Sequence, residues 1–324
     1  MRFRIKGARK ARWAAAALTL ALLAACGGGT QVERFVPARL VVLGDENSLL
    51  DDSGTPGNAR KYTVNATVSA TDPTLDCKIN PIWVQVLANA YGLVFAQCNS
   101  AAAAVTAQML AASGAKVDAI GAQAAQAGTF IGSDLVTVLA GANDIIEQYR
   151  RFPGVSEQQL GAELAAAGEA LAAQVNGIAN AGGKVLIATV PDMGLSPFAI
   201  AEKAANIDTD RASLLTRLTA RFNARLRANI INDGRRIGLL LADEMVQTIA
   251  KFPTVYRFDN TTSAACLSTA VLPACTTATL EPATATAPAA NGSTWLWADG
   301  LHLSPGGHSQ LGALAATRAA GNPF

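Results

Sequence analysis

The sequence predicts an α/β protein built on a doubly wound parallel sheet. Four short, continuously apolar runs alternate with helical patterns along the chain, at residues 39–44, 134–140, 184–190 and 237–241. Strands that are apolar on both faces are typical of parallel sheets covered by helices on both sides. Half of the 324 residues are hydrophobic and only 15% are charged, which supplies a large core and excludes a disordered chain.

The segments between these runs predict the covering helices. Helical patterns occupy residues 81–91, 101–127, a stretch from Ile145, 156–181 and 209–232. Residues 51–81 and 258–294 lack periodicity, and we expect both to be long loops. No glycine-rich phosphate-binding fingerprint follows any of the strands, so the sheet does not read as a nucleotide binder.

The amino terminus predicts export. Six basic residues precede an apolar run at residues 13–25, which is too short for a comfortable membrane span and typical of a secretory signal. Leu23-Ala24-Ala25-Cys26 resembles the lipobox of bacterial lipoproteins, which implies a lipid on Cys26; the alternative is an ordinary signal with a nearby cysteine. We therefore expect a signal peptide over 1–25, a tether over 26–36 and one domain over 37–324. The protein would face the periplasm or be attached to the outer membrane by its lipid anchor.

Removal of the leader changes the charge balance. Six of the 26 lysines and arginines lie in it, which leaves 20 basic against 24 acidic residues. The mature chain is therefore mildly acidic and shows no clustered basic stretch. We expect no nucleic-acid partner.

Four cysteines remain after Cys26, an even number suited to an oxidising compartment. Three pairings are possible, and we favour Cys77 with Cys98 and Cys266 with Cys275 because each pair brackets a local loop. A zinc site is the rival interpretation. No CxxC spacing and no neighbouring histidine support it.

Polar residues gather where the predicted strands end, which is where open parallel sheets carry their functional groups. Three strands are followed by such segments, Gly-Asp-Glu-Asn-Ser at 44–48, Gly-Ala-Asn-Asp at 141–144 and Pro-Asp-Met-Gly at 191–194. Near the carboxyl terminus, Asp299 and His302 are three residues apart in a glycine-containing turn. A carboxylate at this spacing can hold imidazole Nδ1 and leave Nε2 free, as in the base-plus-orienter half of a catalytic triad. The alternative is a surface turn.

Asn143 follows a buried strand on a Gly-Ala turn, where its amide suits an oxyanion donor. The alternative is a cap for the next helix.

Together these segments resemble the SGNH hydrolases, also called GDSL lipases and esterases, particularly their secreted bacterial branch. The resemblance rests on VVLGD, LAGAND, TVPDMGLSP, the 266–275 cysteine loop and WADGLHLSPGGH. It implies a flavodoxin-like three-layer sandwich and hydrolysis of an ester-bearing lipid or small molecule by a serine, without metal or organic cofactor. It also implies that Gly141 and Asn143 form the oxyanion hole, that His302 is the base and that Asp299 orients it.

The first motif departs from the family, which has serine directly after the aspartate. Here Glu46 follows Asp45, and Ser48 begins an S-L-x-D match two residues late. We expect Ser48 to be the nucleophile, and the alternative is that Ser48 is a cap or turn serine. Ser53 is a weaker candidate for the nucleophile. We expect Asp45 and Glu46 to contact the substrate. A two-residue shift moves a side chain by about 6 to 7 Å in extended backbone or rotates it by roughly 200° in a helix. Ser48 therefore reaches His302 only if the turn bulges.

Other residues receive simpler expectations. The family's second motif has a glycine N–H donor, and we place that motif at Ala-Gln-Cys-Asn-Ser, 96–100, where Asn99 or Ser100 would substitute. His308 is expected on the surface of the last helix. Trp295 and Trp297 are expected in the core, with an acyl or sugar pocket as the alternative.

Two functions from different classes follow. The first is an exported, lipid-anchored serine esterase or lipase. The second is a non-catalytic or weakly active envelope lipoprotein that binds a glycan or lipid, which the altered motifs favour. A purely structural envelope protein would leave Asn143, Asp299 and His302 unexplained.

Overall fold

The computed structural model describes residues 34–321 except 70 and 232. The described residues from Phe35 onward form one compact unit. The predicted signal peptide, Cys26 and most of the predicted tether lie outside the described residues. Among those described, no helix has both the length and the apolar character needed to cross a membrane.

The sheet confirms the predicted fold class. It has five parallel strands in the order β2-β1-β3-β4-β5, which are β2 (Ala107–Met109), β1 (Arg39–Gly44), β3 (Asp134–Leu139), β4 (Lys184–Ala188) and β5 (Ile237–Leu240). The four predicted strands are all present. β2 is an addition, and it lies in the segment 101–127 for which the sequence predicted one helix; the helix there, α3 (Ile120–Ala127), covers only its last third.

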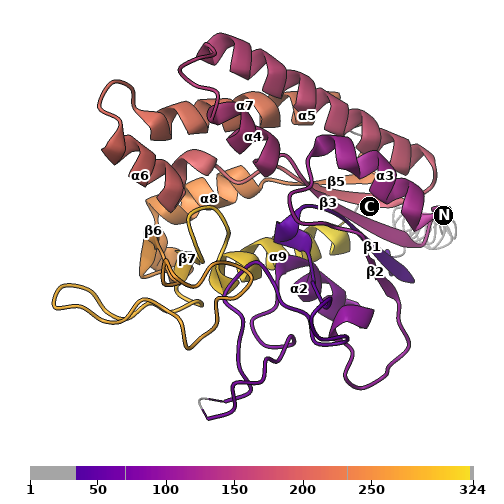
Figure 1. Cartoon of the computed structure of the whole chain (residues 1–324). Helices are drawn as coiled ribbons and strands as arrows, with labels where there is room; N and C mark the ends of the chain where they lie inside the picture. Colours follow the sequence, from indigo (N-terminus) through magenta and orange to yellow (C-terminus); the bar gives the residue numbers. More distant parts are fainter. Residues whose placement is uncertain (1–33, 70, 232, 322–324) are drawn as a thin grey trace, which may run out of the picture. The chain divides into compact units, whose positions relative to one another are not determined.

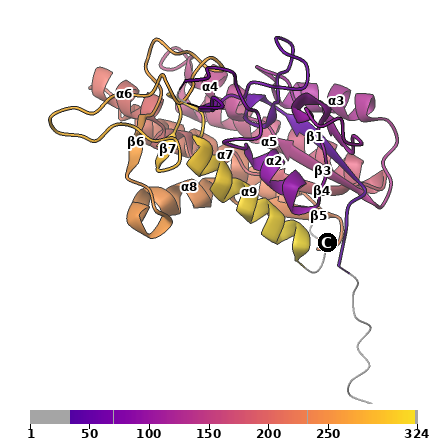
Figure 2. The same cartoon turned by 90° about the horizontal axis from the view of Figure 1, so that it is seen from below.

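Helices cover both faces of the sheet (Figure 1). On one side lie α3, α4 (Ala142–Tyr149), α5 (Glu157–Asn180) and α7 (Arg211–Asn229), and on the other α2 (Trp83–Ala90), α8 (Ala242–Lys251) and α9 (Pro305–Ala320), as the view from below also shows (Figure 2). The short α6 (Pro197–Ala205) packs against α7.

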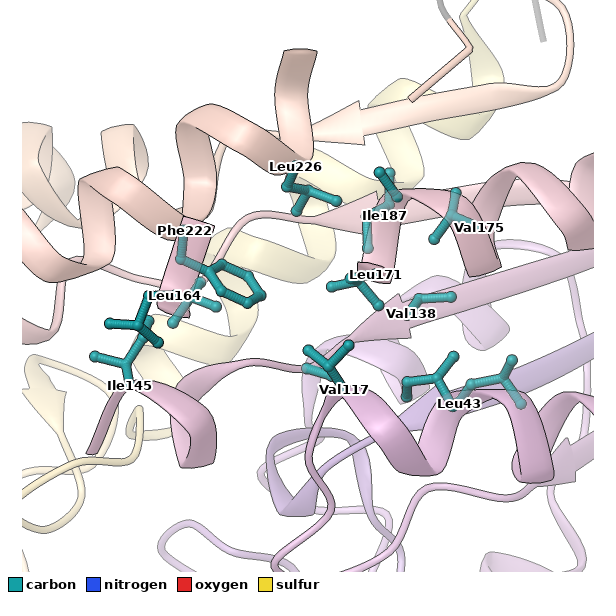
Figure 3. Close-up of a cluster of buried hydrophobic side chains, with 14 of the residues drawn as sticks. Leu43, Val117, Val138, Ile145, Leu164, Leu171, Val175, Ile187, Phe222 and Leu226 are labelled. Carbon is teal, nitrogen blue, oxygen red and sulfur yellow. The ribbon is translucent and has the colours of Figure 1, made fainter. Parts of the chain in front are cut away.

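Successive side chains of β1 enter opposite layers of the core because side chains alternate along a strand. Val41 and Leu43 join the cluster beneath α5 and α7, whereas Leu40 and Val42 join the cluster beneath α2 and α9. Figure 3 shows the first cluster, in which Phe222 and Leu226 of α7 meet Leu164 and Leu171 of α5. Both faces of the sheet are therefore buried, as its continuous apolar strands require.

The two aperiodic segments form long loops below the sheet in Figure 1. Residues 51–81 contain no helix or strand among the residues described, and 258–294 contain only β6 (Asn260–Ala264), which pairs with β7 (Trp295–Trp297). Disulfides join Cys77 to Cys98 and Cys266 to Cys275, which confirms the favoured pairing. Each loop is thus held by one covalent link.

Candidate active site

The turn after β1 sets the direction of the first-motif side chains. Gly44 has φ +134°, and a Cβ at this position would lie 2.1 Å from the Leu139 carbonyl oxygen, so only glycine fits. Asp45 then caps a short 3-10 helix, Glu46–Ser48, by accepting the Asn47 N–H at 3.0 Å. With three residues per turn, Glu46 and Ser48 point in different directions.

Glu46 is the first-motif residue that meets the other candidate site residues. Its Oε1 lies 3.4 Å from His302 Nε2, and its Oε2 accepts the Gly114 N–H at 2.8 Å. Asn143 Nδ2 donates to both carboxylate oxygens, at 3.2 Å and 3.1 Å. Glu46 as a residue is only 8% exposed, and its carboxylate is thus surrounded by an imidazole and two N–H donors.

Asn143 is placed by the beginning of α4. Gly141 is the residue before that helix, with φ +117°, and a Cβ there would lie 2.4 Å from the Phe222 ring. Asn143 lies inside the first turn and its Nδ2 also donates to the Ala115 carbonyl at 3.1 Å. The helix-cap alternative for Asn143 is therefore wrong, because Gly141 occupies the cap position.

Gly114 is a site residue that the sequence interpretation missed. It lies in the turn after β2, with φ +72°, so this turn carries the backbone N–H donor expected at residues 96–100. Asn99 instead makes two hydrogen bonds with Ala103 inside its own loop. The signal was Ser-Gly after a short apolar run, and it was hidden because the alanine-rich surroundings favoured a helix.

Asp299 and His302 form the predicted carboxylate–imidazole pair. His302 Nδ1 lies 2.9 Å from each oxygen of Asp299, and the backbone N–H groups of Leu301 and His302 donate to Asp299 Oδ1 at 2.8 Å and 2.7 Å. These contacts fix the carboxylate within its turn. They leave Nε2 directed at Glu46.

The charges of His302, Glu46 and Asp299 stabilise one another. Burial alone would lower the pKa of His302, but the hydrogen bonds that its ring donates to the Asp299 and Glu46 carboxylates raise it from 6.5 to about 10. Burial would raise the pKa values of Glu46 and Asp299, yet the hydrogen bond with His302 holds both below their usual range. At neutral pH the site is therefore an imidazolium between two carboxylates.

Among the described residues no hydrogen bond joins Ser48 to His302, the contact that the expected nucleophile requires, and His302 Nε2 faces Glu46 instead. Ser48 is fully buried and its Oγ accepts the Trp83 indole N–H at 3.1 Å. Ser53 lies exposed in the following loop. Asp45, expected to contact substrate, is fully buried with one oxygen bonded to Asn47, and burial raises its pKa to about 7.

A second set of missed residues lies in the loop of residues 51–81. The Tyr62 ring is 5.9 Å from the His302 ring, and its hydroxyl donates to Ser113 Oγ at 2.9 Å, beside Gly114. We call residues 61–65 the brace. Its other polar side chains are buried and bond to backbone carbonyls: Lys61 to Cys77, Ile79 and Asn80, Thr63 to Leu303, and Asn65 to Pro273 and Cys275.

Two further expectations concern the carboxyl-terminal region. His308 was expected on the surface and is instead fully buried in α9, where burial lowers its pKa to about 3. Trp295 and Trp297 are buried, as expected for core residues. In the part of the chain that the structure describes, no group of three or more His, Cys, Asp or Glu side chains is arranged to hold a metal.

An imidazole–carboxylate pair and two N–H donors lie at the carboxyl ends of a doubly wound sheet, an arrangement typical of hydrolases of the acyl-transfer class. The chain belongs to the GDSL-like lipase/acylhydrolase family, whose model matches residues 40–315. Membership confirms the resemblance noted in the sequence. Within this family, the chain carries a glutamate where the serine of the G-D-S-L motif is expected.

Solved structures with a similar backbone include esterases. Axe2, an acetylxylan esterase from Geobacillus stearothermophilus, is 13% identical and matches over 89% of this chain and 97% of its own, with a TM-score of 0.42. A member of the lipolytic G-D-S-L family from Veillonella parvula is 12% identical. The match covers 86% of this chain and 95% of that protein, with a TM-score of 0.38. LAE5, an alpha/beta hydrolase from the metagenome of Lake Arreo, is 13% identical. The match covers 89% of this chain and 98% of LAE5, with a TM-score of 0.42. A comparison with curated proteins found no match.

Proposed function

We propose that this family member hydrolyses carboxylic esters of lipids or small molecules, with Glu46 as the reactive residue of its first motif. The observation that carries the proposal is the convergence of His302 Nε2, Asn143 Nδ2 and the Gly114 N–H on the Glu46 carboxylate. In a serine hydrolase these groups serve the nucleophile and the oxyanion. Ser48 lacks them, because its hydroxyl is bonded to Trp83.

In the proposed reaction, Glu46 takes a proton from the water molecule that attacks the ester carbonyl. The carbonyl oxygen becomes negative and accepts hydrogen bonds from Asn143 Nδ2 and the Gly114 N–H. The tetrahedral intermediate then expels the alkoxide, which His302 protonates while Asp299 holds its ring. The proton gained by Glu46 passes to His302, which restores the starting state.

This route requires a movement of Glu46. Its Oε2 accepts the hydrogen bonds of the Gly114 N–H and Asn143 Nδ2, the two donors that the substrate carbonyl oxygen needs. The carboxylate must therefore turn about its terminal side-chain bond when substrate binds. We expect this displacement to weaken substrate binding without preventing hydrolysis.

Turnover of p-nitrophenyl acetate by the described domain tests the proposal. We expect Glu46→Gln and His302→Gln to abolish turnover, Ser48→Ala to retain it, and a fluorophosphonate probe to label no serine. Glu169→Gln, at an exposed position of α5, is the matched control and should behave as the wild type. Labelling of Ser48, or unchanged turnover in Glu46→Gln, would show that Glu46 is not the reactive residue.

A binding function is the second candidate. The observation that favours it is that Glu46 already satisfies the two oxyanion donors. In that case the site would hold a cell-envelope glycan or lipid without cleaving it. Ligand-induced thermal shifts in the absence of turnover would identify this function.

We also propose that the protein is exported and anchored by a lipid on Cys26. The support is the basic and apolar leader, its lipobox-like end and two disulfides in the mature part. Cells expressing the full chain should incorporate labelled palmitate into the protein. Cys26→Ala should remove the label and release the protein from the membrane fraction; retention of the label would refute the assignment.

A further inference from the structure

We propose that the site also opens epoxides, by forming and then hydrolysing an alkyl ester on the Glu46 carboxylate. This activity goes beyond ester hydrolysis, but it uses the same four groups, Glu46, His302, Asn143 and the Gly114 N–H. The substrate class is a small molecule with an electrophilic saturated carbon and an oxygen leaving group.

The chemistry of a carboxylate favours such a carbon. Attack of Glu46 on an ester carbonyl would give a mixed anhydride, which is a more reactive species than the substrate. Attack on a saturated carbon gives an ordinary ester, and carboxylates form covalent intermediates of this kind in other enzymes. An ester on Glu46 is also the type of bond that the surrounding groups are arranged to cleave.

The position of each carboxylate oxygen fits hydrolysis of an ester on this side chain. Oε2 accepts the Gly114 N–H at 2.8 Å and Asn143 Nδ2 at 3.1 Å, so it has the contacts of a carbonyl oxygen in an oxyanion hole. Oε1 lies 3.4 Å from His302 Nε2, where an ester oxygen would receive its proton on leaving. Glu46 can therefore react with a saturated carbon without leaving the donors, whereas an ester carbonyl must displace it.

The first step consumes one proton. Glu46 Oε1 forms a bond to one epoxide carbon, the carbon–oxygen bond of the ring breaks, and the released alkoxide takes the proton from His302 Nε2. The ring is available as a proton donor because Asp299 and Glu46 keep it charged. Loss of the Glu46 charge on alkylation removes one of these two stabilising partners, so neutral His302 remains as a base.

The second step returns that proton. His302 takes a proton from water, the hydroxide adds to Cδ of Glu46, and the negative charge develops on Oε2. The intermediate expels the diol oxygen, Oε1, which takes the proton back from His302. The resulting Glu46 carboxylic acid protonates His302, so epoxide and water give a diol and the site is unchanged.

An isotope experiment reads the covalent step directly. An excess of the protein is mixed with 1,2-epoxy-3-(4-nitrophenoxy)propane in water enriched in 18O, so that each molecule reacts once. The masses of the peptide that contains Glu46 and of the diol are then measured by mass spectrometry. We expect one 18O in the Glu46 carboxylate and none in the diol formed in the first turnover. A diol that carries 18O, with an unlabelled Glu46 peptide, would overturn the proposal; protein without probe is the control for exchange.

Trapping gives a second readout. The matched bromide, 1-bromo-3-(4-nitrophenoxy)propane, loses a leaving group that needs no proton, so it should alkylate Glu46 even in His302→Gln. There the adduct should persist because no base activates water. In the wild type, alkylation neutralises Glu46 and lowers the pKa of His302, which loses its proton to solvent and then activates the water that releases the adduct. Glu46→Gln should remain unlabelled and Glu169→Gln should match the wild type. A folded His302→Gln protein, checked by its thermal melt, with no adduct on Glu46 would overturn the proposal.

Parallel assays with p-nitrophenyl acetate separate this proposal from ester hydrolysis. If that ester is cleaved in a Glu46-dependent manner but neither probe reacts, the epoxide proposal fails alone. If Glu46 is alkylated and regenerated while the ester is not cleaved, ester hydrolysis fails alone.

Discussion

Asn143 Nδ2 donates to both carboxylate oxygens of Glu46, across a sequence separation of 97 residues. The contact joins the end of β1 to the first turn of α4. The Asn143 amide is typical of the family, whereas the Glu46 side chain takes the place of the family's serine.

Replacing the amide should slow the reaction rather than unfold the domain. In Asn143→Ala one of the two N–H donors to the oxyanion is lost, which typically lowers kcat by about 100- to 1000-fold. Steady-state turnover of p-nitrophenyl acetate measures this. Asn229→Ala removes an amide whose hydrogen bond, within the described part of the chain, is to the Arg225 carbonyl; it is the control and should leave kcat unchanged. An equal kcat in Asn143→Ala would remove Asn143 from the mechanism.

Restoring the family motif should create a serine hydrolase. In Glu46→Ser a hydroxyl replaces the carboxylate near His302, and the pKa of His302 should fall because one of its two carboxylate partners is gone. Neutral His302 can then activate the new hydroxyl. We expect a fluorophosphonate adduct at position 46, found by peptide mass spectrometry. The adduct should disappear when His302→Gln is added; an adduct that survives would mean that His302 is not the base.

Ser48→Ala should affect stability and spare activity. The variant leaves the buried Trp83 indole N–H without its acceptor, which costs about 1 to 3 kcal/mol in the free energy of unfolding. Urea denaturation measures the loss. In a Trp83→Phe background the same change should cost less, because no donor is left unpaired. Loss of ester turnover in folded Ser48→Ala would restore Ser48 as a nucleophile candidate.

His302 should make stability depend on pH in a defined direction. Its pKa is about 10 in the folded domain and 6.5 as the reference for the unfolded chain, so the folded state holds an extra proton between these values. Its contribution is therefore complete below about pH 6.5 and disappears as pH rises toward 10. Asp45 and Lys61 also titrate abnormally, near pH 7.

The difference between the wild type and His302→Gln reports mainly this contribution, because Lys61 is common to both proteins and His302 is the smallest of the influences on the pKa of Asp45. Free energies of unfolding measured from pH 5 to pH 10 should converge as pH rises. A difference that stays constant or grows above pH 6.5 would contradict the raised pKa of His302.

Lys61→Met should destabilise the brace. The Lys61 ammonium donates to the carbonyls of Cys77, Ile79 and Asn80, and the methionine side chain leaves them without this donor. We expect a loss of about 1 to 3 kcal/mol in the free energy of unfolding. Lys78→Met, at an exposed position one residue from Cys77, should change stability little. Equal stability of the two variants would show that Lys61 is not a structural donor.

The parts of the site that the sequence predicted are those with a local pattern. Asp299 and His302 are three residues apart, so their contact needs only a turn. Asn143 follows an apolar strand, and parallel strands bring their ends together. Gly114 was missed because alanine has high helix propensity and the surrounding segment reads as helix, while the three-residue strand β2 is too short for a clear pattern.

The remaining errors concern directions and distant contacts. Glu46 and Ser48 differ by two positions, and only the 3-10 turn after Gly44 decides which of them points toward His302. Tyr62 contacts His302 from an aperiodic loop, so no spacing rule predicts the pair. His308 is buried because α9 packs against α2, and nothing in its immediate sequence indicates that neighbour.

The brace is bonded to both disulfide-closed loops, through Lys61 to the Cys77 carbonyl and through Asn65 to the Cys275 carbonyl. A protease that cuts the exposed chain near Val271, inside the ring closed by Cys266 and Cys275, would leave both pieces joined by sulfur. The clipped protein would separate into fragments only after reduction. The rim of the site can therefore survive a proteolytic cut that would detach a loop without a disulfide.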